Sequence, residues 1–316
     1  MLLDYYLIDN KTKELFMNKQ IKFKLSILFG LILLSSCVRD GENLDECIRR
    51  IRIELRWMDT QPLDNSERVN IEIVPTTTTA SPKSDITSDI YGVDLDLLTG
   101  GYAITGWESY TDVDLNKTDL TVGVHTLADG TAMSPAIFSA GHTNTTVEMS
   151  NESLIIPLPM YRQVRPVVIE INFIGDAYSL VNGVTGTLKN IALERSLDNA
   201  FPPVNALSRP AATKSGNMNY TFGLADNIGS GIWYTGTKNL IGIDGNSSQT
   251  LDLTVSFTGD NQPATYAFDV TGQLNEYHTK KINEPWYIIL TLNLGATLDI
   301  TIVDWIAGPE SWIVAH

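Results

Sequence analysis

Apolar and polar residues alternate along most of this chain after residue 47, and this pattern constrains the fold more than any other feature. In the segment IRIELRW, for example, Ile51, Ile53 and Leu55 alternate with Arg52 and Glu54. A period of two is that of a β-strand with one buried face. Similar short runs recur to the end of the chain, separated by Gly, Asn, Asp and Pro, and helical periodicity is hard to find among them. The pattern predicts an all-β protein of the β-sandwich type.

The predicted strands fall into two sets. The first set comprises residues 48–57, 69–74, 92–98, 102–110, 120–127, 145–149 and 154–158. The second set comprises residues 164–173, 184–193, 218–224, 238–243, 250–257, 265–270, 286–294, 297–305 and 311–314. Pro157 and Pro159 stand between the sets, and proline is excluded from central strands. We therefore predict two β-sandwiches in series, over residues 48–160 and 161–316, with a flexible stretch from 75 to 84.

A short apolar run near the N-terminus, residues 25–34, cannot cross a membrane, because a spanning helix needs about 20 apolar residues. Its length is that of the apolar region of a signal peptide, and three lysines precede it, as such a signal requires. The acidic residues within 1–16 fit no signal peptide. We therefore expect translation to start at Met17.

The apolar run ends in a motif that resembles the lipobox of bacterial lipoproteins: Leu34, Ser35, Ser36 and Cys37. In that family the cysteine thiol receives a diacylglycerol, and cleavage makes the cysteine the first residue of the mature protein. The resemblance implies lipidation at Cys37, a leader over residues 1–36 and a lipidated tether over 37–47. Several acyl chains hold a soluble domain at a membrane. The alternative is a secretory signal with a chance cysteine.

The composition narrows the functional classes. A formal net charge of −15 repels nucleic acid and anionic lipid, so neither is an expected partner. With Cys37 lipidated, Cys47 is the single remaining thiol, which leaves no disulfide framework and no cysteine zinc site. The four histidines stand at no metal-ligand spacing, and no nucleophile elbow, phosphate loop or dinucleotide motif is present. We expect no enzymatic activity, no metal and no cofactor.

Two weaker patterns have competing interpretations. The segment from Asp112 to Asp119 imitates the start of a calcium-binding EF-hand loop, but Lys117 replaces the required glycine and Gly123 the bidentate glutamate. The edge of a half-buried strand explains it better. The six tryptophans could stack on sugar rings, but they are scattered, which favours positions in the core.

Several segments, in order, resemble the fimbrial anchor proteins of Bacteroidales, minor members of the fimbrillin superfamily. These segments are DECIRRIRIELRW before and within the first strand, LPMYRQVRPVVIEINF, VNGVTGTLKNIALE, YAFDVTGQL and, near the end, TLDITIVDWIAG. The resemblance implies two tandem transthyretin-like sandwiches held by lipid in the outer membrane, at the cell surface. It also implies a place at the base of a fimbria and fimbrillin-type shaft subunits as partners. Shaft subunits of the superfamily join by strand exchange, a form of β-augmentation.

The C-terminal region contains the predicted strand-exchange segment: Leu298, Ile300, Ile302, Trp305, Trp312, Ile313 and Val314. It has two interpretations, as a strand donated to a partner or as the last strand of its own domain. The anchor relatives keep their first strand, so we expect no cleavage after any of four arginines: Arg49, Arg50, Arg52 and Arg56. The alternative function is an adhesin or glycan-binding lipoprotein on the same scaffold, with residues 205–219 and 226–236 as binding loops for a host or glycan ligand.

Overall fold

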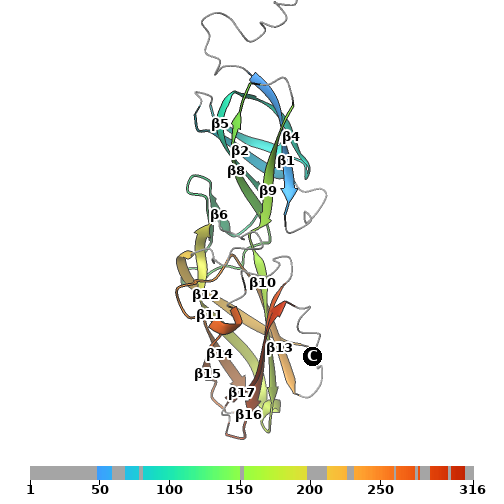
Figure 1. The fold of residues 1–316 in the computed structure, drawn as a ribbon. Helices are drawn as coiled ribbons and strands as arrows, with labels where there is room; N and C mark the ends of the chain where they lie inside the picture. The colour runs from blue at the N-terminus through green and yellow to red at the C-terminus, as the bar shows by residue number, and fades with distance from the viewer. Residues whose placement is uncertain are drawn as a thin grey trace, which may run out of the picture.

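Two β-sheets, each folded over a core of its own, make up most of the described residues, and Figure 1 shows them stacked end to end. The computed structural model describes residues 48–58, 68–77, 81–149, 153–197, 212–225, 231–259, 261–274, 277, 285–297 and 300–309. The prediction of all-β sandwiches is confirmed. Within these ranges, no helix is long and apolar enough to cross a membrane.

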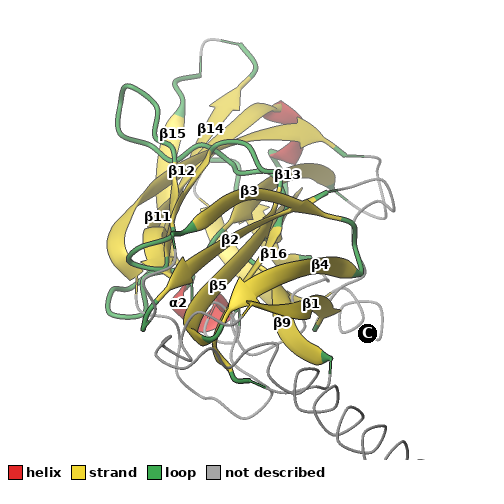
Figure 2. Cartoon of the chain, turned by 90° about the horizontal axis from the view of Figure 1, so that it is seen from above, coloured by secondary structure: helices red, strands yellow, loops and turns green. Residues whose placement is uncertain are grey.

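The first sheet has seven strands: β1 (Ile48–Trp57), β2 (Val69–Pro75), β3 (Lys83–Ser88), β4 (Gly92–Leu98), β5 (Gly100–Glu108), β8 (Ser139–Val147) and β9 (Leu154–Arg162). Their order is β3-β2-β5-β8-β9-β1-β4. The β8–β9 step consists of two residue pairs, Ser139 with Arg162 and Ala140 with Tyr161. The sheet therefore folds into two layers, β3-β2-β5-β8 and β9-β1-β4, and Figure 2 shows β3, β2 and β5 running side by side in one of them.

The first core lies between these layers. It includes Ile51, Ile53 and Leu55 of β1, and Ile71 and Ile73 of β2. These residues are the apolar members of the alternating runs, because successive side chains of a strand point to opposite faces.

The second sheet contains the remaining long strands: β10 (Arg165–Ile174), β11 (Val181–Ser196), β12 (Ala212–Leu224), β13 (Ile232–Leu240), β14 (Thr250–Phe257), β15 (Ala264–Asp269), β16 (Trp286–Leu294) and β17 (Ile300–Pro309). Their order is β15-β14-β11-β12-β13-β10-β16-β17. β12 and β13 share two residue pairs, Gly223 with Thr235 and Leu224 with Tyr234. This sheet also folds into two layers, of four strands each. The structure also describes two short helices in this half of the chain, η2 (Tyr178–Leu180) and α2 (Thr271–Leu274).

A hairpin from the first half of the chain belongs to the second sandwich. Its strands are β6 (Val113–Asn116) and β7 (Thr121–Val124), and β7 pairs with the end of β11. The second core consequently contains Val122 and Phe138. Met160 belongs to the first core and Val164 to the second, so the chain passes between the cores close to the predicted boundary at residue 160. The hairpin and Phe138 precede that boundary in the sequence but belong to the second core.

Several elements differ from the strand predictions. β3 lies in part within the stretch predicted to be flexible, and β6 was not predicted. β8, β12 and β13 each begin six residues before the strands predicted at 145, 218 and 238. β3 is an edge strand whose side chains are mostly exposed, so it lacks apolar alternation. β13 reads IWYTGTKNL, and its burial does not follow a strict period of two.

Candidate functional site

Part of the predicted site lies outside the described residues: Leu34, Ser35, Ser36, Cys37, Leu298, Trp312, Ile313 and Val314. Lipidation of Cys37 and donation of the C-terminal tail therefore remain predictions. Three members of the strand-exchange segment, Ile300, Ile302 and Trp305, lie in β17.

β17 forms an open edge of the second sandwich. It runs antiparallel to β16. The ladder begins where Ile300 pairs with Leu294 and ends where Pro309 pairs with Trp286, and its register shifts between Thr291 and Leu292. Within the part of the chain that the structure describes, no strand pairs with its other side. Ile302 is 45% exposed on this strand. An unpaired edge presents a row of backbone N–H and C=O groups, which is the template that β-augmentation uses.

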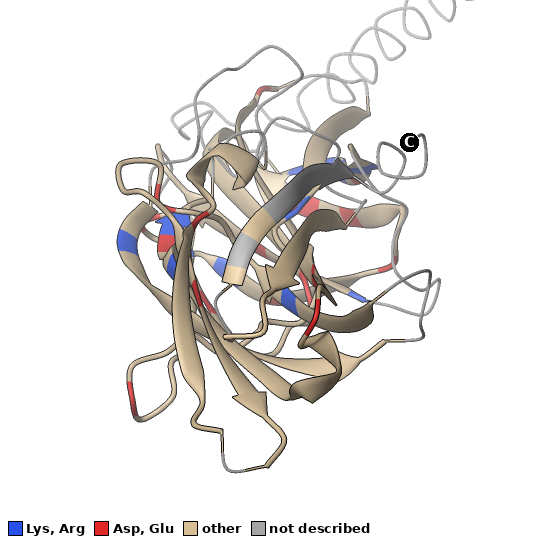
Figure 3. Ribbon diagram, turned by 90° about the horizontal axis from the view of Figure 1, so that it is seen from below, with Lys and Arg blue, Asp and Glu red and all other residues tan. Residues whose placement is uncertain are grey.

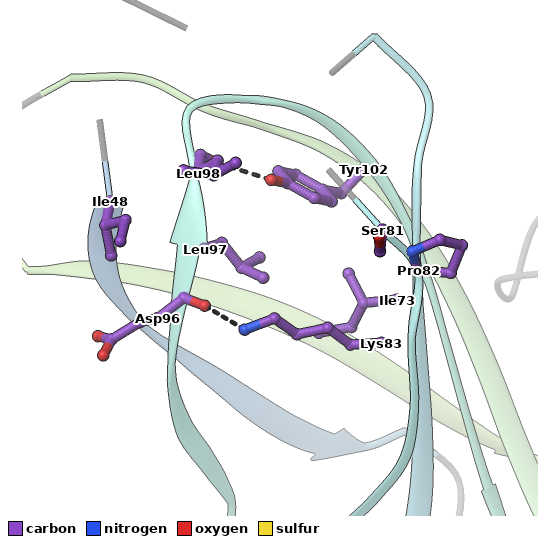
Figure 4. A pocket seen from close by; sticks show the side chains of 9 residues that line it. All are labelled: Ile48, Ile73, Ser81, Pro82, Lys83, Asp96, Leu97, Leu98 and Tyr102. Carbon is purple, nitrogen blue, oxygen red and sulfur yellow. Dashed lines mark hydrogen bonds between the residues drawn. The ribbon is translucent and has the colours of Figure 1, made fainter. Parts of the chain in front are cut away.

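A second open region lies in the first sandwich, between its edge strands β3 and β4. These strands approach each other without forming a ladder, and the Lys83 ammonium donates a hydrogen bond across the gap to the Asp96 carbonyl (2.5 Å). Figure 4 shows the hollow that remains, with a volume of about 420 Å³. Ile73 and Leu97 line it from opposite layers. Mostly apolar side chains therefore border a gap between two strand edges that no other strand of the described residues pairs with.

β1 is held firmly between β9 and β4. It runs parallel to β9 and antiparallel to β4, and three of its side chains are at most 6% exposed: Ile51, Ile53 and Leu55. The Trp57 indole N–H donates to the Ile90 carbonyl (2.8 Å). Arg52 on the outer face forms an ion pair with Asp94 (3.3 Å). The backbone after Arg50 and Arg52 is therefore part of a two-sided ladder. Arg49 pairs with β4 alone and Arg56 with β9 alone.

The junction between the sandwiches contains buried polar groups that the sequence analysis did not single out. Arg195 is fully buried and donates to the carbonyls of Ile241 (2.6 Å) and Gln163 (2.8 Å). Burial lowers the pKa of Arg195 to about 9, against the opposing effect of Tyr277. Its hydrogen-bond partners are carbonyl and amide oxygens, which stabilise the charged form. We interpret the guanidinium as charged and structural.

Arg165 lies in the same junction at the start of β10. It donates to the Tyr277 carbonyl (2.5 Å), and its guanidinium lies 4.8 Å from the Trp286 ring centroid. The sequence signal for Gln163 and Arg165 was the polar run YRQVR inside an otherwise apolar segment, and Arg195 lies outside that run. Buried arginines held by carbonyls and aromatic faces stabilise one arrangement of neighbouring elements.

The calcium-like segment forms the turn of the β6–β7 hairpin. The Asn116 side-chain oxygen accepts hydrogen bonds from the backbone N–H groups of Thr118 and Asp119, both at 3.0 Å. This is an Asx-type turn, which explains the polar residues without a metal. Among the described residues, no group of three or more His, Cys, Asp or Glu side chains is placed to hold a metal ion.

The two loops predicted to bind a ligand are largely strands. Residues 212–219 belong to β12 and 232–236 to β13, so these segments pair in the second sheet. The prediction of free binding loops is wrong for these parts. Several small and polar residues of β12 are exposed positions of a strand, whereas residues 232–236 of β13 are buried or half-buried. The remaining residues of both loops lie mostly outside the described ranges.

Charged groups are dispersed over the molecule. Figure 3 shows positive and negative residues scattered across the face seen from below. Several are paired, such as Lys189 with Asp252 (2.5 Å). The candidate sites are thus edges of sheets rather than charged patches.

Fold and site together define a class: a tandem β-sandwich protein whose open strand edges are its most evident binding features. No family model matches the sequence, and no curated protein matches it. Solved structures do share the fold. The fimbrial anchor protein Mfa2 from Porphyromonas gingivalis has a TM-score of 0.55 at 9% identity, covering 83% of this chain and 98% of that one.

Two candidate adhesins from Bacteroides ovatus are similar to the same degree. One has a TM-score of 0.55 at 14% identity, covering 75% of this chain and 88% of its own. The other has a TM-score of 0.54 at 13% identity, with 86% and 98% covered. At such identities the comparison establishes the fold. The structural neighbours agree with the resemblance found in the sequence.

Proposed function

We propose that this chain is a non-catalytic surface lipoprotein that anchors a fimbria to the outer membrane. The observation that carries the proposal is β1, which completes the first sandwich from within the chain. The fold shared with a fimbrial anchor protein and with candidate adhesins supports a role at the cell surface.

A β1 strand that is paired within its own sandwich is expected for a subunit at the end of a filament rather than in its shaft. A subunit in the middle of a strand-exchange polymer both donates a strand and accepts one. Here the place between β9 and β4 is filled, and burial of Ile51, Ile53 and Leu55 stabilises the filling strand. A chain of this kind has no such groove to offer, and it connects to the filament through another surface.

The open edge of β17 is that surface in our proposal. A strand of a shaft subunit would pair with the backbone of β17 and extend the layer β13-β10-β16-β17. The lipid on Cys37, at the opposite end of the mature sequence, would hold the complex at the membrane.

Site-specific photo-crosslinking in the native cell tests this contact. A photoreactive phenylalanine analogue replaces Ile302, and a matched variant carries it at Leu127, which is similarly exposed at 49%. We expect a crosslink from position 302 to a fimbrillin-like subunit and none from position 127. Crosslinks at 302 only to proteins unrelated to fimbriae, or none at all, would contradict the proposal.

A further inference from the structure

We propose that a cleft beside the β6–β7 hairpin, named here the hairpin cleft, binds a neutral saccharide. The cleft lies on the outer face of the first sandwich, away from β17 and from the hollow between β3 and β4. The inference goes beyond the fimbrial role and does not depend on it.

The floor of the hairpin cleft is the layer β2-β5-β8. Core side chains of these strands point inward, so their neighbours face out in rows across the sheet. Two outward rows form the floor: Glu72, Thr105 and His142, then Val74, Ala103 and Asn144. Directly opposite residues in adjacent strands are about 5 Å apart. The row of Val74, Ala103 and Asn144 is the more accessible one, whereas Thr105 in the other row is buried.

The wall of the hairpin cleft is the tip of the hairpin, which stands over this floor. Lys117 reaches from the tip to Glu72 (3.0 Å) and lies 4.7 Å from the Trp107 ring centroid. These contacts fix the distance between wall and floor. The volume of this open cleft is about 530 Å³, within the roughly 300–1,000 Å³ typical of small-molecule sites.

The polar groups in the hairpin cleft suit hydroxyl groups. Asn144 is exposed, and its side-chain amide has no hydrogen-bond partner among the described residues. His142 shares a 3.1 Å hydrogen bond with Thr105 through Nδ1, which leaves Nε2 for a ligand. An amide and an imidazole each offer a donor or an acceptor, as hydroxyl-rich ligands require.

The charges in the hairpin cleft favour a neutral ligand. Of its lining residues, Lys117 and Glu72 carry full charges, and they neutralise each other. The chain as a whole has a formal net charge of −15, which repels anions. Val74, Ala103 and Leu115 add small apolar surfaces that suit the C–H faces of a pyranose ring. Neutral polar groups beside apolar patches favour a saccharide over a phosphorylated or acidic ligand.

The test uses the full mature protein on an array of neutral and acidic oligosaccharides. The neutral ones contain hexoses, fucose and N-acetylhexosamines. Retained sugars are then titrated calorimetrically against three variants. Asn144→Ala removes the unpartnered amide, and Ala103→Phe fills the floor of the hairpin cleft. Thr146→Ala, on the same strand and also exposed, is the control outside the cleft.

We expect at least one neutral oligosaccharide to bind, with affinity reduced by about tenfold in Asn144→Ala, as for the loss of a good hydrogen bond. Ala103→Phe is expected to abolish binding, and Thr146→Ala to leave it unchanged. Circular dichroism confirms that each variant is folded. The proposal is overturned if no neutral sugar binds, if only acidic sugars bind, or if both cleft variants bind like the wild type. None of these outcomes bears on attachment to a fimbria.

Discussion

Single side chains hold loops of this protein in place through hydrogen bonds, and Asp244 is the clearest example. Its carboxylate accepts hydrogen bonds from the Asn246 backbone (2.9 Å) and from the hydroxyls of Ser215 and Ser247 (2.8 Å each). Burial alone would raise the pKa of Asp244, but these hydrogen bonds outweigh it, and the pKa lies below its ordinary value of 3.8. The charged form therefore ties the loop after β13 to β12.

Replacing Asp244 with asparagine is expected to lower the free energy of unfolding by about 1–3 kcal/mol at neutral pH. Because the folded-state pKa is depressed, this contribution is present in full above 3.8 and is lost as pH falls through the lowered pKa. Urea denaturation at neutral pH and in steps below pH 3.8 measures the difference in free energy of unfolding between the wild type and the variant. Asp176→Asn, at an exposed position, is the control. A difference in free energy of unfolding that stays constant with pH would contradict the role of the charged Asp244 carboxylate.

Gly141 allows the backbones of β8 and β9 to meet. A Cβ atom built there would lie 1.8 Å from the Pro159 carbonyl oxygen, whereas one at Gly183 would meet nothing within 4 Å. Gly141→Ala is expected to cost about 1–3 kcal/mol or more, as overpacking does. Gly183→Ala is expected to change stability by less than about 1 kcal/mol. Thermal unfolding of both variants checks this, and equal effects would show that the close approach is not needed.

At the scale of elements, β1 decides how the first sandwich is completed. Ile53 is fully buried between β9 and β4, whereas the Arg52 side chain on the other face is 41% exposed. Ile53→Ala is expected to destabilise the protein by about 2–5 kcal/mol. Arg52→Ala, which removes a surface ion pair, is expected to cost no more than about 1 kcal/mol. Chemical denaturation of the two variants measures both free energies of unfolding. An Ile53→Ala variant as stable as the wild type would mean that β1 is not needed for the stability of the first sandwich.

The sequence predicted elements with alternating burial and missed those without it. β1, β2, β10, β14 and β16 carry apolar residues at every second position, and each was predicted within a few residues. β3, an exposed edge strand, and β13, with irregular burial, lack this signal. Sequence spacing could not show that β6 and β7 join the second sheet, because that pairing depends on contacts distant along the chain.

The candidate site was predictable to a similar extent. The apolar alternation around Ile300 and Ile302 predicted a strand, and the structure contains β17 there. That β17 is an edge strand follows from the strand order, which single-sequence patterns do not specify. The hairpin cleft was invisible in the sequence, since Glu72, His142 and Lys117 lie on three separate elements that only the fold brings together.

At the scale of the whole molecule, the β6–β7 hairpin joins the two sandwiches. Val122 is fully buried in the second core and pairs with Arg195 of β11, while Lys117 in the same hairpin contacts Glu72 of the first sheet. Together with the buried arginines at the junction, this hairpin links the stability of one sandwich to the other. Such a connection would suit the proposed role between a filament and a membrane.

Val122→Ala is expected to destabilise the second sandwich, although the residue belongs to the first half of the chain. The expected cost is about 1.5–3 kcal/mol for the lost methyl groups and the cavity. Hydrogen exchange followed by mass spectrometry should show faster exchange in β7 and at the end of β11. Faster exchange confined to strands of the first sheet would contradict the role of the hairpin.

The central claim is that this protein anchors a fimbria. The most direct measurement compares surface filaments sheared from cells with the gene intact and from cells with the gene deleted. Mass spectrometry detects the protein in the filaments, and electron microscopy measures filament length and attachment. We predict that the protein co-purifies with filaments and that deletion yields long or shed ones. Unchanged filaments, with the protein confined to the outer-membrane fraction, would contradict the account.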